Sequence, residues 1–218
     1  NLGPEARLNH PEWLISLISQ AWDRQDIFAA NQARPPMTLR LNSRKTSREK
    51  YIELLEKAGI NSRPGSLTET SVVIHQPLSV TDIPGFEKGF VSVQDEGAQL
   101  AATLIDMKPG DIVLDACAAP GGKTGHLLEQ RDVNVTAVDW DKKRIKKITQ
   151  NLKRLNLNAR ILCQDIETWH TTSKFNYILL DVPCSATGII RRHPEIKLLR
   201  TKSDIVKLVS DQSSLLNK

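Results

Sequence analysis

The sequence predicts an α/β protein in which a doubly wound parallel sheet follows a small α+β module. Three observations support this fold class. From about residue 95, short apolar segments alternate with helix-like segments, as in strands joined by helical crossovers. Residues 35–90 instead carry short strand-like segments separated by turn residues. The stretch Arg34-Pro35-Pro36 interrupts regular structure and marks a linker between the first helix and this module.

The expected divisions are a helical linker segment at 1–34, the α+β module at 35–90 and the parallel-sheet domain at 91–218. A chain of 218 residues can hold one full domain and a smaller one. In the first segment, residues 10–22 predict a short helix, with Pro11 at the first helical position. Its expected buried face consists of Leu14, Leu17, Ile18 and Ala21.

The α+β module begins with an alternating segment at 37–41, which predicts a strand. Thr46 and Glu49 form a possible capping box that opens a helix, and Gly59 closes this helix. The remaining expected elements are short strands at 71–75 and 90–93, with turns at Pro64-Gly65 and Pro84-Gly85.

The parallel-sheet domain is expected to begin with a helix at 97–107 that turns Leu100, Leu104 and Met107 inward. Four strands are expected at 112–116, 133–139, 160–164 and 177–182. One helix should follow the first strand as far as Glu129. The next should bury Ile145, Ile148, Leu152 and Leu155. Ser203 is expected to cap a last helix that packs through Ile205, Leu208 and Val209.

The composition is that of an ordinary soluble protein, with 39% hydrophobic and 25% charged residues. No apolar run approaches a membrane span, and the N-terminal segment lacks the layout of a signal peptide. The three separated cysteines predict neither a disulfide scaffold nor a zinc cluster, and no residue pair has metal-ligand spacing. We therefore expect no metal and a reducing, cytoplasmic location. The net charge of +5 modestly favours a polyanionic partner.

The ends of the sequence predict a fragment of a longer protein. The chain begins at Asn1, its first methionine is Met37, and it stops at Lys218 inside a helix-like pattern.

The strongest local signal is VLDACAAPGGKT at 113–124, where an apolar strand ends in Asp115 and a small-residue turn leads into a helix. Such a turn lets a ligand approach the backbone, and the helix N-terminus offers free amides. Two nucleotide motifs do not fit, because Cys117 stands where a P-loop requires glycine and no G-x-G-x-x-G occurs. A structural strand-turn-helix is the alternative, and the acids at the other strand ends favour a ligand site.

Three further acids stand at strand ends, namely Asp139, Asp165 and Asp181. Ligands in open α/β sheets bind at the carboxyl ends of strands, so these side chains are expected to converge. Asp139 suits a ribose diol, and Asp165 an adenine amino group. A single aspartate of this kind is often only a cap or turn residue.

Cys184 lies in DVPCSATG at 181–188 and is a candidate thiol for handling a substrate base. A lone cysteine is more often a small buried hydrophobe, but its polar neighbours Asp181 and Ser185 favour the chemical role. Cys117 and Cys163 are expected to be structural.

Two basic segments remain. The cations of 142–147 are best explained as a solvated helix face. Arg191, Arg192 and His193 follow the Cys184 loop and are expected to contact the phosphate groups of a polyanionic partner.

The chain resembles the bacterial 16S ribosomal RNA 5-methylcytosine methyltransferases, the Fmu/Sun group of the NOL1/NOP2/Sun family. The resemblance covers nearly the whole chain and is strongest in VSVQDEGAQLAA (91–102), DACAAPGGKT (115–124), AVDWDKKR (137–144) and LLDVPCSATGIIRRHPEIKLLR (179–200). It implies a Rossmann-like S-adenosylmethionine-dependent methyltransferase sheet, here incomplete and lacking its last strands, behind an RNA-recognition-like module. It also implies that an N-terminal helical RNA-binding domain of full-length members is missing.

The resemblance assigns S-adenosyl-L-methionine as cofactor and 16S ribosomal RNA as partner. The implied cofactor-binding residues are Asp115, Cys117, Ala118, Ala119, Pro120, Gly121, Gly122, Lys123, Asp139, Asp165 and Asp181. Asp139 would hold the ribose, Asp165 the adenine edge, and Asp181 would lie between cofactor and cytosine.

In the family mechanism a cysteine thiolate adds to carbon-6 of cytosine, which makes carbon-5 nucleophilic enough to accept a methyl group. The nucleophile lies in a Thr-Cys motif, and the Pro-Cys cysteine, matched here by Cys184, assists product release. Together with Asp181 it forms the expected catalytic pair. No Thr-Cys pair occurs in these residues, so we expect cofactor binding without turnover.

Two alternatives remain. A non-catalytic RNA-binding module would tolerate the missing Thr-Cys pair but has little need of the 181–188 loop. An amino-group methyltransferase would carry an Asn/Asp-Pro-Pro-aromatic loop in place of DVPC. With no fifth strand beside it, 177–182 is expected to be an exposed edge that aggregates or pairs with a second chain.

Overall fold

The computed structural model describes residues 3–22 and 26–218, which form two compact units. One unit combines the described part of Asn1–Pro35 with Pro183–Lys218, and the other comprises Pro36–Val182. The boundaries expected from the sequence at residues 34 and 90 stay a prediction.

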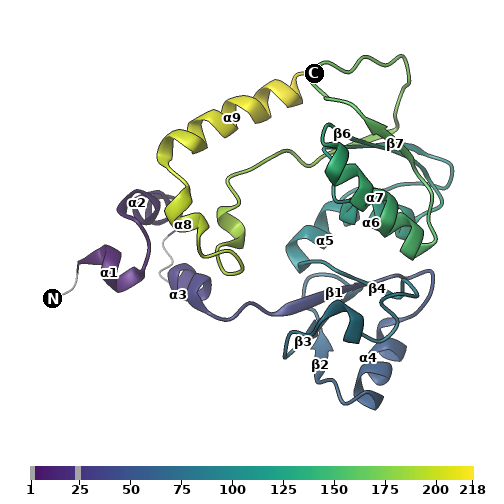
Figure 1. Cartoon of the computed structure of the whole chain (residues 1–218), viewed down its shortest axis with the longest axis horizontal. Coiled ribbons are helices and arrows are strands. Elements are labelled where there is room, and N and C mark those ends of the chain that lie inside the picture. Colours follow the sequence, from purple (N-terminus) through teal and green to yellow (C-terminus); the bar gives the residue numbers. More distant parts are fainter. Residues whose placement is uncertain (1–2, 23–25) are drawn as a thin grey trace. The chain divides into compact units, whose positions relative to one another are not determined.

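The unit Pro36–Val182 begins with a four-stranded antiparallel sheet in the order β2-β3-β1-β4 (Figure 1). Its strands are β1 (Met37–Leu41), β2 (Ser62–Pro64), β3 (Ser71–Ile74) and β4 (Val91–Val93). All residues of β1 and β3 are buried. On one face of these strands, helix α4 (Arg48–Lys57) packs Tyr51 and Leu55 into the core. A single 3-10 turn, η1 (Val80–Asp82), follows β3.

The cap of α4 differs from the expectation by one residue. Ser47, not Thr46, is the N-cap, and its hydroxyl accepts a hydrogen bond from the Lys50 amide. Thr46 instead donates its hydroxyl to the Ser47 carbonyl. Gly59 has a φ of +72° and stands just beyond the helix, as expected for a closing glycine.

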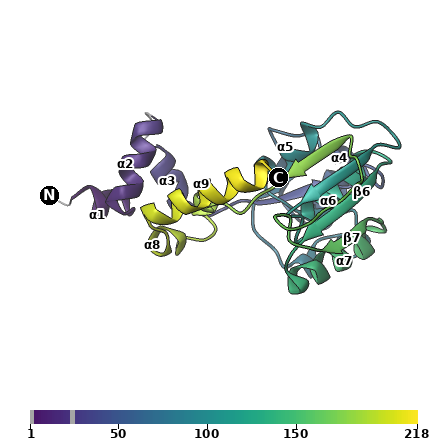
Figure 2. The same ribbon diagram turned by 90° about the horizontal axis from the view of Figure 1, so that it is seen from above.

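The second sheet of this unit is parallel, in the order β7-β6-β5-β8. Its neighbouring strands β6 and β7 are labelled in Figure 2. Its strands are β5 (Ile112–Ala116), β6 (Asn134–Asp139), β7 (Arg160–Cys163) and β8 (Tyr177–Leu180). The reversal of strand order at β5 is typical of Rossmann-like sheets, so the predicted fold class is confirmed. Among the described strands, β8 pairs only with β5, which leaves its other side as a sheet edge.

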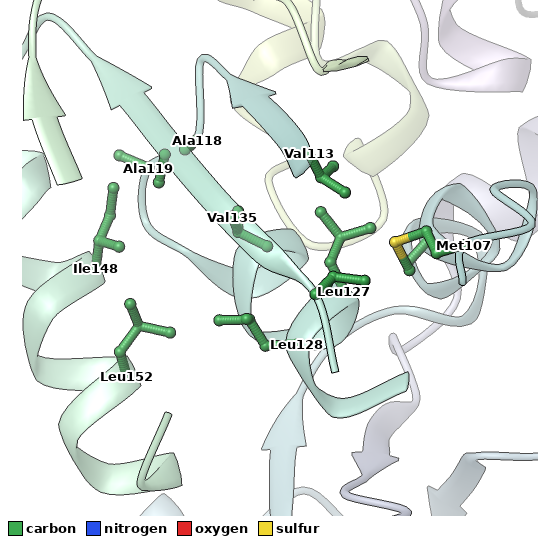
Figure 3. Packing of buried hydrophobic residues seen from close by; sticks show 12 residues of the cluster. Met107, Val113, Ala118, Ala119, Leu127, Leu128, Val135, Ile148 and Leu152 are labelled. Carbon is green, nitrogen blue, oxygen red and sulfur yellow. The ribbon is translucent and has the colours of Figure 1, made fainter. Parts of the chain in front are cut away.

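Helices α5 (Glu96–Thr103), α6 (Gly122–Gln130) and α7 (Lys142–Leu155) contribute to the core on one face of the parallel sheet. Figure 3 shows Val113 and Val135 of neighbouring strands close to Leu127 and Leu128 of α6, with Ile148 and Leu152 of α7 beside them. On the other face, a smaller cluster of strand residues packs against the segment around Trp169 and Phe175. The alternation of side chains along β5 therefore turns Asp115 toward the helical face.

Helix α5 is shorter than expected, and the prediction that Leu104 points inward is wrong. The helix ends at Thr103, and Leu104 is 84% exposed. Met107 is buried as predicted, but it reaches the core from the turn that leads to Pro109-Gly110. Because the helix stops at Thr103, Leu104 and Met107 do not share the buried helix face that the sequence predicted.

The other unit is built from short helices: α1 (Pro4–Leu8), α2 (Glu12–Ala21), α3 (Asp26–Gln32), the 3-10 turn η2 (Thr187–Ile189), α8 (Ile196–Leu199) and α9 (Lys202–Leu216). Pro11 is the N-cap of α2 and not its first helical residue. Of the predicted inward face of this helix only Leu14 is buried. The Lys197 ammonium joins the two halves of the unit by donating to the Asn9 carbonyl at 2.9 Å.

The cap and packing of α9 were also predicted incorrectly. Thr201 is the N-cap, because Thr201 and Asp204 form a complete capping box that Ser203 cannot form. The helix buries none of its residues. Ile205 and Leu208 are half-buried, and Val209 is 56% exposed.

No helix within residues 3–22 and 26–218 has the length and apolar character needed to cross a membrane. Over the same residues there is no cluster of three potential metal-binding side chains.

Candidate functional site

The turn between β5 and α6 is the centre of the candidate site. Cys117 and Gly121 have φ values of +60° and +93°, and the Ala118 amide donates to the Val138 carbonyl of β6 at 3.0 Å. A Cβ on Gly121 would lie 3.0 Å from the Ile148 Cα atom. The turn is therefore tight because residue 121 is glycine, and it is held directly against β6 and α7.

Asp115 ends β5 beneath this turn and is fully buried. Its Oδ2 atom accepts a 2.5 Å hydrogen bond from the Thr124 hydroxyl, whereas no donor in the described chain reaches Oδ1. The pKa of Asp115 is raised to about 7, mainly by burial and also by the nearby carboxylates Asp181 and Asp139, against the opposing effects of the Thr124 hydrogen bond and Lys123. A buried acceptor with one unused oxygen fits a ligand that brings an N–H donor or a positive charge.

Asp139 ends β6 and ties the turn to the neighbouring strand. Its two carboxylate oxygens accept hydrogen bonds from the Ala119 amide at 3.0 Å and the Asp141 amide at 3.1 Å. Arg144 stands 3.7 Å from the same carboxylate and donates to the Ala119 carbonyl. Asp139 thus binds the backbone N–H of Ala119 and Arg144 binds its C=O, so both backbone polar groups of this turn residue are fixed.

Asp181, one residue beyond β8, forms an ion pair with Lys123 in the first turn of α6. Its side chain is 50% exposed, against 19% for that of Lys123, so the pair is partly accessible to solvent. Asp139 and Asp181 also act on Cys117: burial, followed by these two charges, raises the pKa of its thiol to about 11. Cys117 is therefore a protonated thiol, which agrees with a structural role.

Asp165 is exposed at the strand end next to Asp139. It follows β7, whose end is joined to β6 by a 3.0 Å hydrogen bond from the Gln164 amide to the Asp139 carbonyl. The Asp165 carboxylate accepts a hydrogen bond from the Glu167 amide at 3.0 Å, which is the geometry of an Asx turn. Of the predicted cofactor residues, the structure brings together Asp115, the 117–123 turn, Asp139 and Asp181, with Asp165 exposed at the adjoining strand end.

Cys184 and the predicted RNA-contacting residues belong to the other compact unit. Cys184 is a free, exposed cysteine. Arg191 donates to the backbone carbonyls of Ala33 and Arg34 at 3.2 and 2.7 Å, so its guanidinium has a structural role within this unit. His193 faces Glu195 at 3.1 Å, and the Arg192 amide donates to the Ile189 carbonyl.

Sequence reasoning missed three residues that shape the site. Thr124 was within the quoted motif, but its partnership with Asp115 was not foreseen. Arg144 was placed on the solvated face of α7, although it binds the turn. Arg40 is fully buried in β1 and donates to the Gly122 carbonyl. Arg40 occupies a polar position of the alternating segment 37–41, so no local signal marked it as buried.

Comparison with known families gives two matches. Residues 102–218 match the family described as 16S rRNA methyltransferase RsmB/F. Residues 10–81 match the family described as a Methyltr_RsmF/B-like, ferredoxin-like domain.

Among curated proteins, the chain is 48% identical over 221 residues to ribosomal RNA small subunit methyltransferase B of Pseudomonas syringae, covering 98% of this chain and 49% of that protein. It is 45% identical over 212 residues to the protein of that name from Vibrio vulnificus, covering 94% and 50%. The chain therefore spans about half the length of the curated relatives it matches.

Among solved structures, a methyltransferase homologue from Pyrococcus horikoshii is 29% identical with a TM-score of 0.83. The match covers 99% of this chain and 72% of that one.

Proposed function

The chain belongs to the 16S rRNA methyltransferase RsmB/F family, and from this we propose that its site serves methyl transfer from S-adenosyl-L-methionine to carbon-5 of a cytosine in small-subunit ribosomal RNA. The observation that carries the cofactor assignment is the buried Asp115 carboxylate with an unused oxygen, set under a glycine-rich turn. Ribosomal RNA is the proposed partner, and the cytoplasm the proposed location.

The residues present fit such a cofactor. Asp115 offers an acceptor for an ammonium group, and the first turn of α6 has amide N–H groups without helical partners. We assign the methionine and ribose portion to Cys117, Ala118, Ala119, Pro120, Gly121, Gly122 and Lys123 together with Asp115. Asp139 is assigned to the ribose hydroxyls and Asp165 to the adenine edge. The carboxylate oxygens of Asp139 each accept one hydrogen bond and retain capacity for another.

Bound S-adenosylmethionine would supply an electrophilic methyl group. Asp181 is proposed to act between cofactor and cytosine, and its carboxylate is paired with the Lys123 ammonium. Attack at carbon-6 requires a cysteine thiolate, and the proposed nucleophile is that of a Thr-Cys pair, which these 218 residues do not contain. Cys184 is assigned to product release, so the chain as printed is proposed to bind cofactor without turning over.

Phosphate contacts are assigned to Arg191, Arg192 and His193. Arg191 already donates to two backbone carbonyls, so its contribution requires that one of its remaining N–H groups face the RNA. A second candidate is an RNA-binding module that retains the methyltransferase fold without catalysis.

The test is transfer of labelled methyl groups from S-adenosylmethionine to unmodified small-subunit ribosomal RNA. The printed chain is compared with a chain extended through a Thr-Cys segment, and with the extended chain carrying Cys184→Ser. We expect only the extended chains to transfer methyl groups, with the Cys184→Ser form accumulating a covalent RNA adduct. Turnover by the printed chain would make Cys184 the nucleophile and overturn the assignment.

Calorimetry of the printed chain with S-adenosylmethionine tests the cofactor site separately. We expect binding by the wild type and at least a tenfold loss in Asp115→Asn, which removes the carboxylate charge at nearly constant volume. RNA binding without cofactor binding would favour the non-catalytic candidate.

A further inference from the structure

The only arginine in β1, Arg40, is completely buried, and all its N–H contacts are long-range in sequence. Its Nε and Nη2 atoms each donate to one Glu129 oxygen at 2.9 Å, in a bidentate pair. Its Nη1 atom donates both to the Gln94 side-chain oxygen at 2.6 Å and to the Gly122 carbonyl at 2.7 Å. Arg40 thus connects the antiparallel sheet to both ends of α6.

Gly122 is the first residue of α6. It lies within residues 117–123, the turn proposed above to bind the cofactor, which we call the cofactor turn. The first turn of this helix is held at two points: the Thr124 hydroxyl is bonded to Asp115, and the Gly122 carbonyl to Arg40. A cation beside a helix N-terminus is electrostatically unfavourable, so Arg40 is not placed there to stabilise the helix. Its position is accounted for by the Gly122 carbonyl, with Glu129 balancing the charge.

Gly125 lies where α6 packs closely against Leu155 and beside this guanidinium. A Cβ at position 125 would lie 3.4 Å from Arg40 Nη2 and 2.9 Å from Leu155 Cδ1. Glycine in a helix interior is destabilising relative to alanine, so its presence requires a packing reason. The space that Gly125 leaves is occupied by Arg40 and Leu155.

We propose that Arg40 is a positioning residue for the cofactor turn. Glu129 holds the Arg40 guanidinium, and the guanidinium fixes the Gly122 carbonyl. Through this contact the antiparallel sheet influences the affinity for the cofactor. The inference rests on the proposed function for the identity of the ligand. It adds that the α+β module is part of the scaffold of the cofactor site, independently of any contact it makes with RNA.

Removing Arg40 alone would leave Glu129 buried and unpaired, which could prevent folding. The decisive variant is therefore Arg40→Met combined with Glu129→Met, which removes both charges and replaces them with flexible apolar side chains. Arg40→Lys is the conservative variant, because it retains a charge beside Glu129 but has a single donor group that cannot reproduce the bidentate and Gly122 contacts together.

Arg154 provides the matched control. It stands in the last turn of α7, donates to the Phe86 and Val91 carbonyls at 2.7 and 2.9 Å, and lies 4.0 Å over the Phe86 ring. It therefore also joins the parallel-sheet part to the module, but it makes no bond to the cofactor turn. Arg154→Met loosens the same junction while leaving Gly122 untouched.

Two measurements are made on the printed chain and each variant. Calorimetry with S-adenosylhomocysteine should show at least a tenfold higher Kd for the double variant, an intermediate value for Arg40→Lys, and a change below threefold for Arg154→Met. Hydrogen exchange without ligand should show faster exchange of the 122–125 amides in the double variant only, with thermal unfolding midpoints verifying that all variants are folded.

Wild-type affinity and unchanged exchange in a folded double variant would overturn the inference, as would equal effects of the double variant and Arg154→Met. If the wild-type chain binds no ligand, the proposed cofactor site fails, and the exchange measurement still decides whether Arg40 fixes the turn.

Discussion

The Thr124 hydroxyl donates a 2.5 Å hydrogen bond to Oδ2 of Asp115, so the first turn of α6 is fastened to the end of β5 directly beneath the cofactor turn. This bond stabilises the charged carboxylate, yet burial outweighs it and the pKa of Asp115 is raised to about 7. Asp115 is thus a carboxyl group whose charge is costly in the folded chain without a ligand.

The first prediction concerns this charge. The folded pKa of Asp115 lies above its ordinary value of 3.8, so the folded chain retains a proton that the unfolded chain has lost. The resulting stabilisation is fully present below pH 4 and is lost as the pH rises toward 7. Relative to Asp115→Asn, the wild-type free energy of unfolding should fall by roughly 4 kcal/mol across this range. Urea unfolding at several pH values measures it, and a pH-independent difference would refute the shift.

His126 should produce the opposite dependence. It is buried in α6, and desolvation, followed by the charge of Arg40, lowers its pKa to about 3. Between pH 3 and 6.5 the unfolded chain binds a proton that the folded chain does not, so stability rises with pH in this window. Relative to His126→Gln, the wild type should gain about 4 kcal/mol from pH 3 to 6.5. The same urea series tests this, and His75, which is exposed in the loop after β3, provides the control variant His75→Gln.

The third prediction separates backbone strain from crowding at Gly121. Gly121 and Gly110 both have strongly positive φ, but a Cβ would meet the Ile148 Cα at 3.0 Å in the first case and nothing within 4 Å in the second. Gly110→Ala should therefore cost about 1–2 kcal/mol, the conformational penalty alone. Gly121→Ala should cost roughly a further 1–3 kcal/mol for overpacking and should also weaken cofactor binding. Chemical denaturation measures the free energy of unfolding of both variants. Equal losses would show that the backbone at Ile148 moves away from the added Cβ at no energetic cost.

The fourth prediction concerns the open edge of the parallel sheet. Ile178 of β8 is 61% exposed, and among the described strands β8 pairs only with β5. We expect this edge to drive self-association of the chain, because an apolar edge strand offers unpaired backbone groups to another chain. Ile178→Lys should lower the sedimentation-detected oligomer fraction severalfold. Leu104→Lys, at a more exposed position outside any strand, should change the oligomer fraction little. If both substitutions lower this fraction equally, the chain associates through exposed apolar residues in general and not through pairing of the β8 edge.

Strands and strand-end acids were the features most accessible from the sequence. The bounds of β1 and β5 were predicted as observed, because each is a short apolar or alternating run between turn residues. Asp115, Asp139 and Asp181 follow from the general rule that parallel strands present their carboxyl ends at one edge. Helix α7 was equally clear, since Ile148, Leu152 and Leu155 are buried at helical spacing.

Features that depend on a choice between adjacent residues, or on distant ones, were not accessible. Thr46 and Ser47 are both good N-caps, and the sequence does not distinguish them, whereas the structure has Ser47 as the cap. The two-charge link between Arg40 and Glu129 joins residues 89 positions apart, so no local pattern could indicate it. Strand β2 is short and polar and forms only by pairing with β3, which again requires the fold.

The position of β8 has a consequence for how the chain is made. Strand β5 is synthesised first and pairs on one side with β6, yet its other neighbour is the last of the four strands to leave the ribosome. In a nascent chain, one side of β5 therefore stays an unpaired sheet edge until Tyr177–Leu180 emerges. Until the same stage of synthesis, Lys123 lacks its ion-pair partner Asp181. This interval is where chaperones that shield unpaired strands should act, and slowed translation between β5 and β8 should prolong the chain's exposure to misassembly.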